Sequence, residues 1–162
     1  MRKTSVYDVQ SLFFNNTTTG IGGGLYAGGG CVVEGTGLVF EANKASLGGG
    51  VALQEAALSL RETQLLENEG VFSGGGVFLA GAEATLDEVV FVENKAQNGV
   101  GLYAWGSQLE HTDGGYQGPE TEVERVFGGA VYLEASAAVL REVDVTRHQG
   151  TGYGLGLCLV ES

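Results

Sequence analysis

Gly48-Gly49-Gly50-Val51-Ala52-Leu53 is one of six glycine-led hydrophobic steps that decide the fold of this 162-residue chain. The aliphatic residue that follows the glycines falls at positions 25, 51, 77, 102, 131 and 157, so successive steps are 26, 26, 25, 29 and 26 residues long. A near-constant period of this length indicates a repeat protein, in which each unit buries its apolar face against its neighbours. The other five steps begin at Gly22, Gly74, Gly99, Gly128 and Gly154.

Each repeat divides into short segments in which apolar and polar residues alternate. In the second repeat these segments are 51–53, 58–60 and 63–65. Alternation with a period of two indicates strands with one face on a core, and no stretch keeps the 3.6-residue period of a helix. We therefore predict an all-β, right-handed parallel β-helix of about six coils of about 26 residues, as a single domain over residues 1–162. At the spacing of strands in a sheet, such a rod is roughly 29 Å long.

A second periodic feature is an asparagine that follows an apolar residue by three positions. It occurs at Asn16, Asn43, Asn68 and Asn94, whereas His148 takes this place in the last repeat. Asparagine tolerates a left-handed backbone at a bend, and stacked asparagines hydrogen-bond one another. We expect a structural asparagine ladder along the rod. The leucine-rich repeat has an overlapping period, but it has no place for the glycine runs or for the second strand, so we reject it.

The charge of the chain excludes several classes of partner. The formal net charge is −12, with 20 acidic and 8 basic residues. This balance disfavours nucleic acid and anionic membrane surfaces, both of which attract clustered lysine and arginine. No run of 18 apolar residues exists, so we expect no membrane insertion by this segment, and the first residues lack the apolar core of a signal peptide. Cys31 and Cys158 lie in the first and last repeats, roughly 24 Å apart at the strand spacing, so we expect no disulfide between them.

Two motifs carry a resemblance to known proteins. Phe40-x-x-Asn43 and Phe91-x-x-Asn94, with the Gly-Gly-Gly-Val and Gly-Gly-Ala-Val runs, resemble the paired F-x-x-N and G-G-A-[ILV] repeats of the polymorphic outer membrane proteins. The chain also resembles the bacterial right-handed β-helix repeat proteins of the pectin-lyase-like superfamily, over about residues 11–159. The resemblance implies an adhesive passenger that is secreted or displayed on the outer membrane, and therefore an extracellular or cell-surface location. Most repeats lack the full spacing of both motifs.

Both ends of the chain begin or finish on apolar strands without a polar cap. Solenoids need capped ends, because exposed edges otherwise associate. We therefore expect a fragment of a longer β-helix, with further coils of the parent chain as its neighbours.

The period breaks between the fourth and fifth repeats, where 29 residues replace 26. Residues 108–122 contain Asp113-Gly114, a turn signal, and Pro119, which cannot join a central ladder. We predict an irregular inserted loop here. His111, Asp113, Glu120 and Glu122 could coordinate a divalent metal, although no spacing enforces it and a solvated loop is the alternative.

Aromatic residues recur between the aliphatic residues of the glycine-led steps. If those aliphatic residues face the core, alternation points the aromatics outward. An outward column could stack for stability, anchor a partner protein or contact glycans, and a reversed phase would make it core. The candidate binding residues are Tyr26, Phe78, Tyr103, Trp105 and Tyr132.

Catalytic motifs are missing from the sequence. Stacked carboxylates such as Glu62 and Glu88 arise in any acidic β-helix, and Arg61 with Asp87 predicts a surface ion pair between coils. No nucleophile-elbow, zinc-protease or phosphate-loop motif occurs in the sequence. We therefore expect no cofactor. We expect a non-catalytic structural or adhesive surface protein that contacts glycans or surface proteins of a host or neighbour. The alternative is a carbohydrate-active lyase or hydrolase with its site near residues 108–122.

Overall fold

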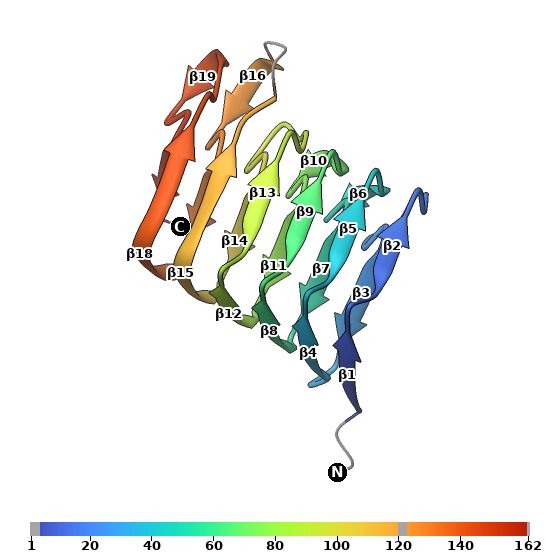
Figure 1. Cartoon of the computed structure of the whole chain (residues 1–162). Coiled ribbons are helices and arrows are strands. Elements are labelled where there is room, and N and C mark those ends of the chain that lie inside the picture. Colours follow the sequence, from blue (N-terminus) through green and yellow to red (C-terminus); the bar gives the residue numbers. More distant parts are fainter. Residues whose placement is uncertain (1–3, 120–122, 162) are drawn as a thin grey trace.

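A computed structural model describes residues 4–119 and 123–161 of the chain. All regular structure in these residues is β-strand, and the strands of successive turns pair in parallel. Figure 1 shows the turns stacked one on the next, from the blue amino-terminal end to the red carboxyl-terminal end. One sheet contains six strands, one from each turn, and its strands begin about 26 residues apart. The predicted fold, a parallel β-solenoid of about six turns without helices, is confirmed.

The six-stranded sheet is built from the glycine-led steps. Its strands pair in strict register, so Val51 lies between Leu25 and Val77 on the neighbouring strands. In chain order the strands are β3 (Leu25–Gly28), β7 (Val51–Gln54), β11 (Val77–Ala80), β14 (Leu102–Trp105), β17 (Val131–Glu134) and β20 (Leu157–Val160).

The ten-stranded sheet faces it across the core and receives two short strands from each of the early turns (Figure 1). The first strands of these turns are β1 (Ser5–Val9), β4 (Val32–Thr36), β8 (Ala57–Arg61) and β12 (Glu83–Asp87). The second strands are β2 (Leu12–Phe14), β5 (Val39–Glu41), β9 (Gln64–Leu66) and β13 (Val90–Val92). In the last two turns, β15 (Gln108–Gln117) and β18 (Ala137–Thr146) each span both positions as one strand.

The predicted loop over 108–122 is therefore wrong for its first ten residues. Gln108–Gln117 is strand β15, which pairs in register with β12, β13 and β18. The additional residues lie further along the chain. Gln117 and Phe127 are ten residues apart, whereas their partners in the next turn, Thr146 and Tyr153, are seven apart. Glu120 and Glu122 fall in this longer connection and lie outside the described residues.

The third side of the solenoid has shorter strands. β6 (Lys44–Leu47) pairs with β10 (Glu69–Ser73), and β16 (Val123–Phe127) pairs with β19 (Gly150–Tyr153). Isolated bridges, such as the one between Ser73 and Asn98, continue this side through the fourth turn. Both pairs contain a shift of register. This side therefore closes each turn without forming a continuous sheet.

The core consists of columns of equivalent residues from successive turns. Val77 and Leu79 of β11 are fully buried, as are Val51 and Leu53 of β7 below them. On the opposite sheet one column contains Phe13, Phe40, Leu65, Phe91 and Tyr116. The Phe13 and Phe40 rings stack at 4.6 Å, and the Phe91 and Tyr116 rings stack at 4.5 Å. Each large buried side chain of this kind contributes about 1.5–3 kcal/mol.

The asparagine ladder is confirmed. The Asn16 Nδ2 donates to Asn43 Oδ1 at 2.8 Å, and the same bond links Asn43 to Asn68 at 3.0 Å and Asn68 to Asn94 at 3.1 Å. Each buried amide also donates to a backbone carbonyl of the preceding turn, as Asn68 does to Phe40 O at 2.8 Å. These bonds satisfy backbone groups that would otherwise be buried without partners.

Left-handed residues make the corners of each turn. At the corner between the two halves of the ten-stranded sheet, Glu62, Glu88, Asp113 and Glu142 have φ between 49° and 54°. A non-glycine residue is uncommon in this region, and here each side chain is charged and directed to solvent. At the glycine corner the requirement is different. Gly49 has ordinary φ, but a Cβ there would lie 2.6 Å from backbone atoms of Glu69, so two turns touch through bare backbone.

We expect Gly49→Ala to lower the free energy of unfolding by about 1–3 kcal/mol, because the added methyl group meets the backbone of the next turn. The control is Gly20→Ala, where the nearest atom to an added Cβ is Thr18 Oγ1 at 3.4 Å. Urea unfolding followed by circular dichroism measures both. Equal loss in the two variants would contradict the close contact at Gly49.

We expect Asn68→Ala to lower the free energy of unfolding by about 3 kcal/mol, because Phe40 O and the donors of Asn43 lose their buried partner. Asn98→Ala is the matched control. Its one side-chain hydrogen bond, to Ser73 Oγ at 3.4 Å, is long and partly exposed, so the loss should stay below about 1 kcal/mol. If the ladder contributed nothing to stability, both variants would have similar midpoints of urea unfolding.

Candidate functional site

The six-stranded sheet carries all five aromatic residues predicted to bind a partner. We call Tyr26, Phe78, Tyr103, Trp105 and Tyr132 the aromatic face. Val77 and Leu79 are both 0% exposed and belong to the core cluster, whereas Phe78 between them does not. Of the two phases that the sequence leaves open, the structure therefore has the one in which the aliphatic residues face the core.

Three rings of the aromatic face form a stack along the rod. Phe78 and Tyr103 have ring centroids 5.4 Å apart, and Tyr103 and Tyr132 have centroids 5.1 Å apart, all nearly parallel. Phe78 is only 7% exposed, so it supports the stack without being a contact surface itself. Parallel rings on adjacent strands add about 0.2–1 kcal/mol per pair.

Tyr26 stands apart from this stack. Ala52 occupies the position between Tyr26 and Phe78. The Tyr26 hydroxyl donates to Gln54 Oε1 at 3.1 Å, and the ring leans over Gly28, where a Cβ would lie 2.5 Å from that hydroxyl. Tyr26 remains half exposed, but its hydroxyl is directed along the sheet toward the next turn.

Trp105 and Glu134 lie at one border of the stack, each two residues after a stacked tyrosine. Trp105 is 52% exposed, and its register partner on β17 is Glu134. The Tyr103 hydroxyl donates to Glu134 Oε2 at 2.7 Å. Burial, together with this carboxylate, raises the pKa of Tyr103 far above its ordinary value, so the hydroxyl stays protonated and donates to Glu134.

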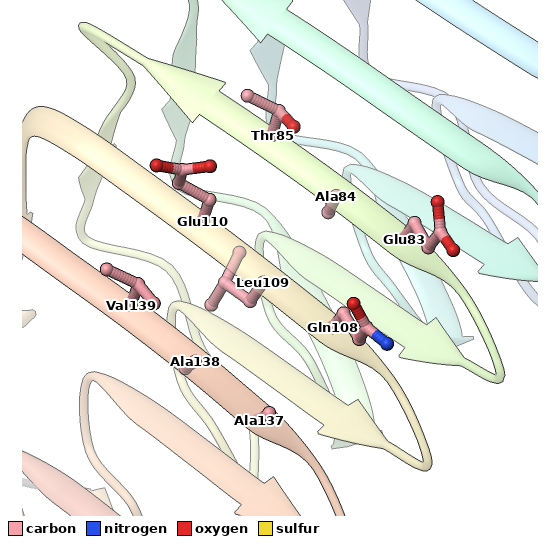
Figure 2. Close-up of a pocket in the computed structure, with 9 residues that line it drawn as sticks. All are labelled: Glu83, Ala84, Thr85, Gln108, Leu109, Glu110, Ala137, Ala138 and Val139. Carbon is pink, nitrogen blue, oxygen red and sulfur yellow. The ribbon is translucent and has the colours of Figure 1, made fainter.

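The outer surface of the ten-stranded sheet has a shallow groove over β12, β15 and β18. Figure 2 shows the small side chains of Ala137 and Ala138 at one border and the carboxylates of Glu83 and Glu110 on the neighbouring strands. The Glu110 carboxylate is paired with Arg141. The groove therefore holds one carboxylate already engaged by a cation, which does not favour the alternative of a glycoside-cleaving pair.

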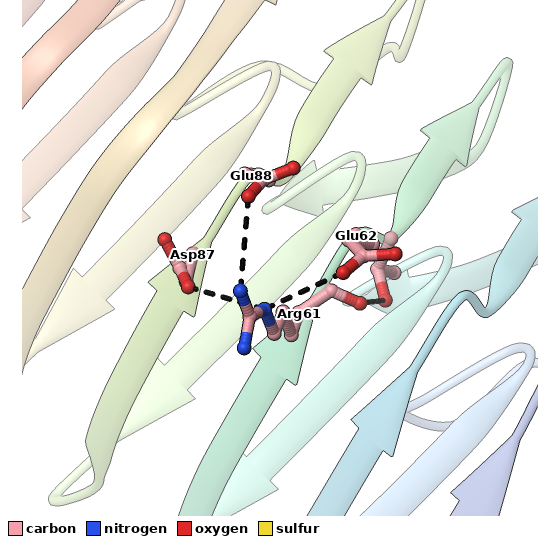
Figure 3. A network of polar contacts seen from close by, with 5 residues as sticks. Arg61, Glu62, Asp87 and Glu88 are labelled. Atoms are coloured by element: carbon pink, nitrogen blue, oxygen red, sulfur yellow. Dashed lines mark hydrogen bonds and ion pairs between the residues drawn. The ribbon is translucent and has the colours of Figure 1, made fainter.

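The stacked carboxylates predicted between coils share a single arginine. Arg61 lies between Glu62 at 3.5 Å, Asp87 at 3.5 Å and Glu88 at 3.9 Å, as Figure 3 shows. The predicted ion pair of Arg61 with Asp87 is confirmed. All four side chains are largely exposed, so the network relieves repulsion between turns and adds little net stability.

His111 is buried in the core and does not face the surface. Its Nε2 lies 3.0 Å from Val89 O and its Nδ1 lies 3.0 Å from the Tyr116 hydroxyl. Because a carbonyl can only accept, Nε2 carries the proton and Nδ1 accepts from Tyr116. His148 also reaches Tyr116, with Nε2 3.3 Å from its backbone carbonyl. The two histidines of the chain therefore converge on one buried tyrosine.

The residues predicted to bind a metal are not brought together where the structure describes them. Both ring nitrogens of His111 are engaged inside the core, while Asp113 is exposed at a corner. Within residues 4–119 and 123–161, no three histidine, cysteine, aspartate or glutamate side chains gather closely enough to hold a metal ion. Cys31 and Cys158 are both free thiols.

Two residues of this region went unrecognised in the sequence. Tyr116 follows Phe91 by one 25-residue repeat, so the core column of Phe40, Leu65 and Phe91 was the signal that predicts its burial. Glu134 lies two residues after Tyr132 and therefore shares its outward face. Nothing in the sequence reports that its carboxylate bonds to Tyr103 of the preceding turn.

Comparison with known proteins gives one match. Residues 10–28 match the Chlamydia polymorphic membrane protein repeat. No curated protein and no solved structure matched the chain. Across the described parts of the chain, no helix is long and apolar enough to span a membrane. The match covers β2, the Phe13-x-x-Asn16 motif that begins in it, and the glycine-led step at Gly22 that leads into β3 of the six-stranded sheet.

We expect the stability of the protein to fall as the pH decreases below about 6.5. Burial lowers the pKa of both His111 and His148 in the folded chain, although a backbone carbonyl opposes the shift. The unfolded chain therefore takes up protons first, and stability present above pH 6.5 is lost as the pH falls toward the lowered pKa. The slope is at most about 1.4 kcal/mol per pH unit for each histidine.

Urea midpoints at pH 7.5, 6.5 and 5.5 measure this effect. In His111→Gln the amide can still donate to Val89 O and accept from Tyr116, but it does not titrate. This variant should lose part of the pH dependence, and the double variant with His148→Gln should lose most of it. An unchanged slope in the double variant would assign the pH dependence to the carboxylates instead.

Proposed function

We propose that the chain is a non-catalytic segment of a surface-displayed passenger, and that its aromatic face makes an adhesive contact with a partner. The match of residues 10–28 to a membrane protein repeat supports display at the outer membrane or cell surface. The observation that carries the adhesive contact is Trp105, a large side chain left 52% exposed beside the stacked rings of Tyr103 and Tyr132. Exposed aromatic groups are the usual anchors of binding surfaces.

The rigidity of the sheet favours this use. Tyr103 is fixed by stacking on both sides and by its bond to Glu134, so a partner does not need to order it. Binding to a preorganised surface avoids the cost of fixing side chains at the moment of contact. The stacked rings together with the exposed indole of Trp105 offer a rigid apolar strip to a glycan or to a protein, which are the two partner classes that the sequence predicts.

Further solenoid turns are the other proposed neighbours. Leu133 is 5% exposed, but its register partner in the last turn, Leu159, is 68% exposed. A similar loss of cover occurs in the first turn, where Val6 is 48% exposed although its register partner Val33 is 4% exposed. Additional coils of the parent chain stacked on these turns would cover both residues, as each inner turn is covered by its neighbours.

The adhesive contact is tested with beads coated with the purified chain and applied to cultured epithelial cells. We expect Trp105→Ala to reduce bead attachment at least fivefold, because it removes the exposed anchor without touching the core. Phe72→Ala is the matched control, since Phe72 is 53% exposed on β10, on another side of the rod. Equal attachment of the two variants would overturn the assignment to the aromatic face, and labelling of intact source cells with an antibody tests display separately.

A further inference from the structure

The six strands beneath the aromatic face contain no lysine or arginine. Among their residues Glu134 is the one acidic side chain. The described basic side chains lie elsewhere, with Arg61 and Arg141 on the ten-stranded sheet and Lys44 on β6. The face thus combines exposed aromatic rings with negative charge and offers no cation of its own.

The Glu134 carboxylate has no cationic partner among the described residues, and it combines this with a hydrogen bond from an aromatic hydroxyl and a register position beside an exposed tryptophan. Glu69 is paired with Lys44 at 2.7 Å, Glu110 with Arg141, and Asp87 with Arg61. Glu134 instead accepts one hydrogen bond, from the neutral Tyr103 hydroxyl to Oε2. Its second oxygen has no hydrogen-bond or ion-pair partner among the described residues. A half-buried carboxylate of this kind gains from a cation supplied by another molecule.

Trp105 lies beside this carboxylate. The two residues are register partners on neighbouring strands, which lie roughly 4.8 Å apart, and both point outward. Tryptophan is the aromatic ring that attracts cations most strongly across its face. An ammonium or guanidinium group placed over the indole can therefore reach the free oxygen of Glu134 at the same time.

We propose that the partner of the aromatic face is a basic peptide segment, with a lysine or arginine side chain lying over Trp105 and paired with Glu134. This inference rests on the proposed adhesive function and adds the chemical class of the partner. The net charge of −12 favours approach of a basic segment from a distance, and it repels sulfated or sialylated glycans. A neutral sugar could stack on Trp105 but would bring no cation to Glu134.

The single tryptophan of the chain makes the test direct, because Trp105 fluorescence reports this site alone. The purified protein is titrated at 150 mM salt with a lysine–glycine hexapeptide, with a glutamate–glycine hexapeptide and with a neutral cello-oligosaccharide. We expect the fluorescence of Trp105 to change, and the change to saturate, with the lysine peptide only. Glu134→Gln should weaken that binding about tenfold, because glutamine keeps the acceptor for Tyr103 but removes the charge.

Glu83→Gln is the matched control, since it removes the same charge from the exposed surface of the ten-stranded sheet. It should weaken binding less than twofold. Equal weakening by the two variants would overturn the proposal and show diffuse attraction to an acidic protein. A response to the oligosaccharide but not to the lysine peptide would overturn it while leaving the adhesive function intact. Lysine-peptide binding that depends on Glu134, in a protein whose bead attachment does not depend on Trp105, would support this site and overturn the adhesive function.

Discussion

The stacking of one turn on the next, in register and at the spacing of parallel strands, is the constraint on which the rest of the structure depends. It places each side chain against the residue about 26 positions away, so the molecule is organised in columns. A column is stable only if its members suit one another. Phenylalanines stack in the core, asparagine amides bond head to tail at a bend, and tyrosines stack on the outer surface. The same geometry that stabilises like apolar groups penalises like charges.

The acidic composition therefore has to be accommodated column by column. At the corner of Glu62 and Glu88, Arg61 lies among three carboxylates and relieves their repulsion. Glu110 has Arg141 one turn further on. At Glu134 the structure places no cation, and the carboxylate instead accepts a hydrogen bond from the neutral hydroxyl of Tyr103. Charge compensation therefore differs from one column to the next, although exposed ion pairs of this kind add little net stability.

The sequence predicts which residues form a column better than it predicts the side-chain contacts within that column. The glycine period, the alternation of Val51–Leu53 and the recurring asparagines were enough to predict the solenoid and the ladder, because register follows directly from period. The phase of Tyr103 stayed open, because it depends on which of two alternating sets of side chains is buried. The prediction failed at 108–117, where His111 and Tyr116 look polar although they occupy core positions and satisfy each other. The burial of Phe78, the lean of Tyr26 and the bond of Tyr103 to Glu134 depend on side-chain contacts between turns, which no single repeat encodes.

Function in such a scaffold is changed by replacing an outward residue in one turn, because the register of the backbone does not depend on that side chain. The column that contains Trp105 makes the point, since its members in successive turns are Gly28, Gln54, Ala80, Trp105, Glu134 and Val160. Six different side chains occupy geometrically equivalent positions on one sheet. Only the fourth and fifth turns combine an exposed indole with a carboxylate that lacks a cation. The backbone repeats throughout the rod, so the recognition chemistry proposed for Trp105 and Glu134 would be confined to one place by side-chain identity alone.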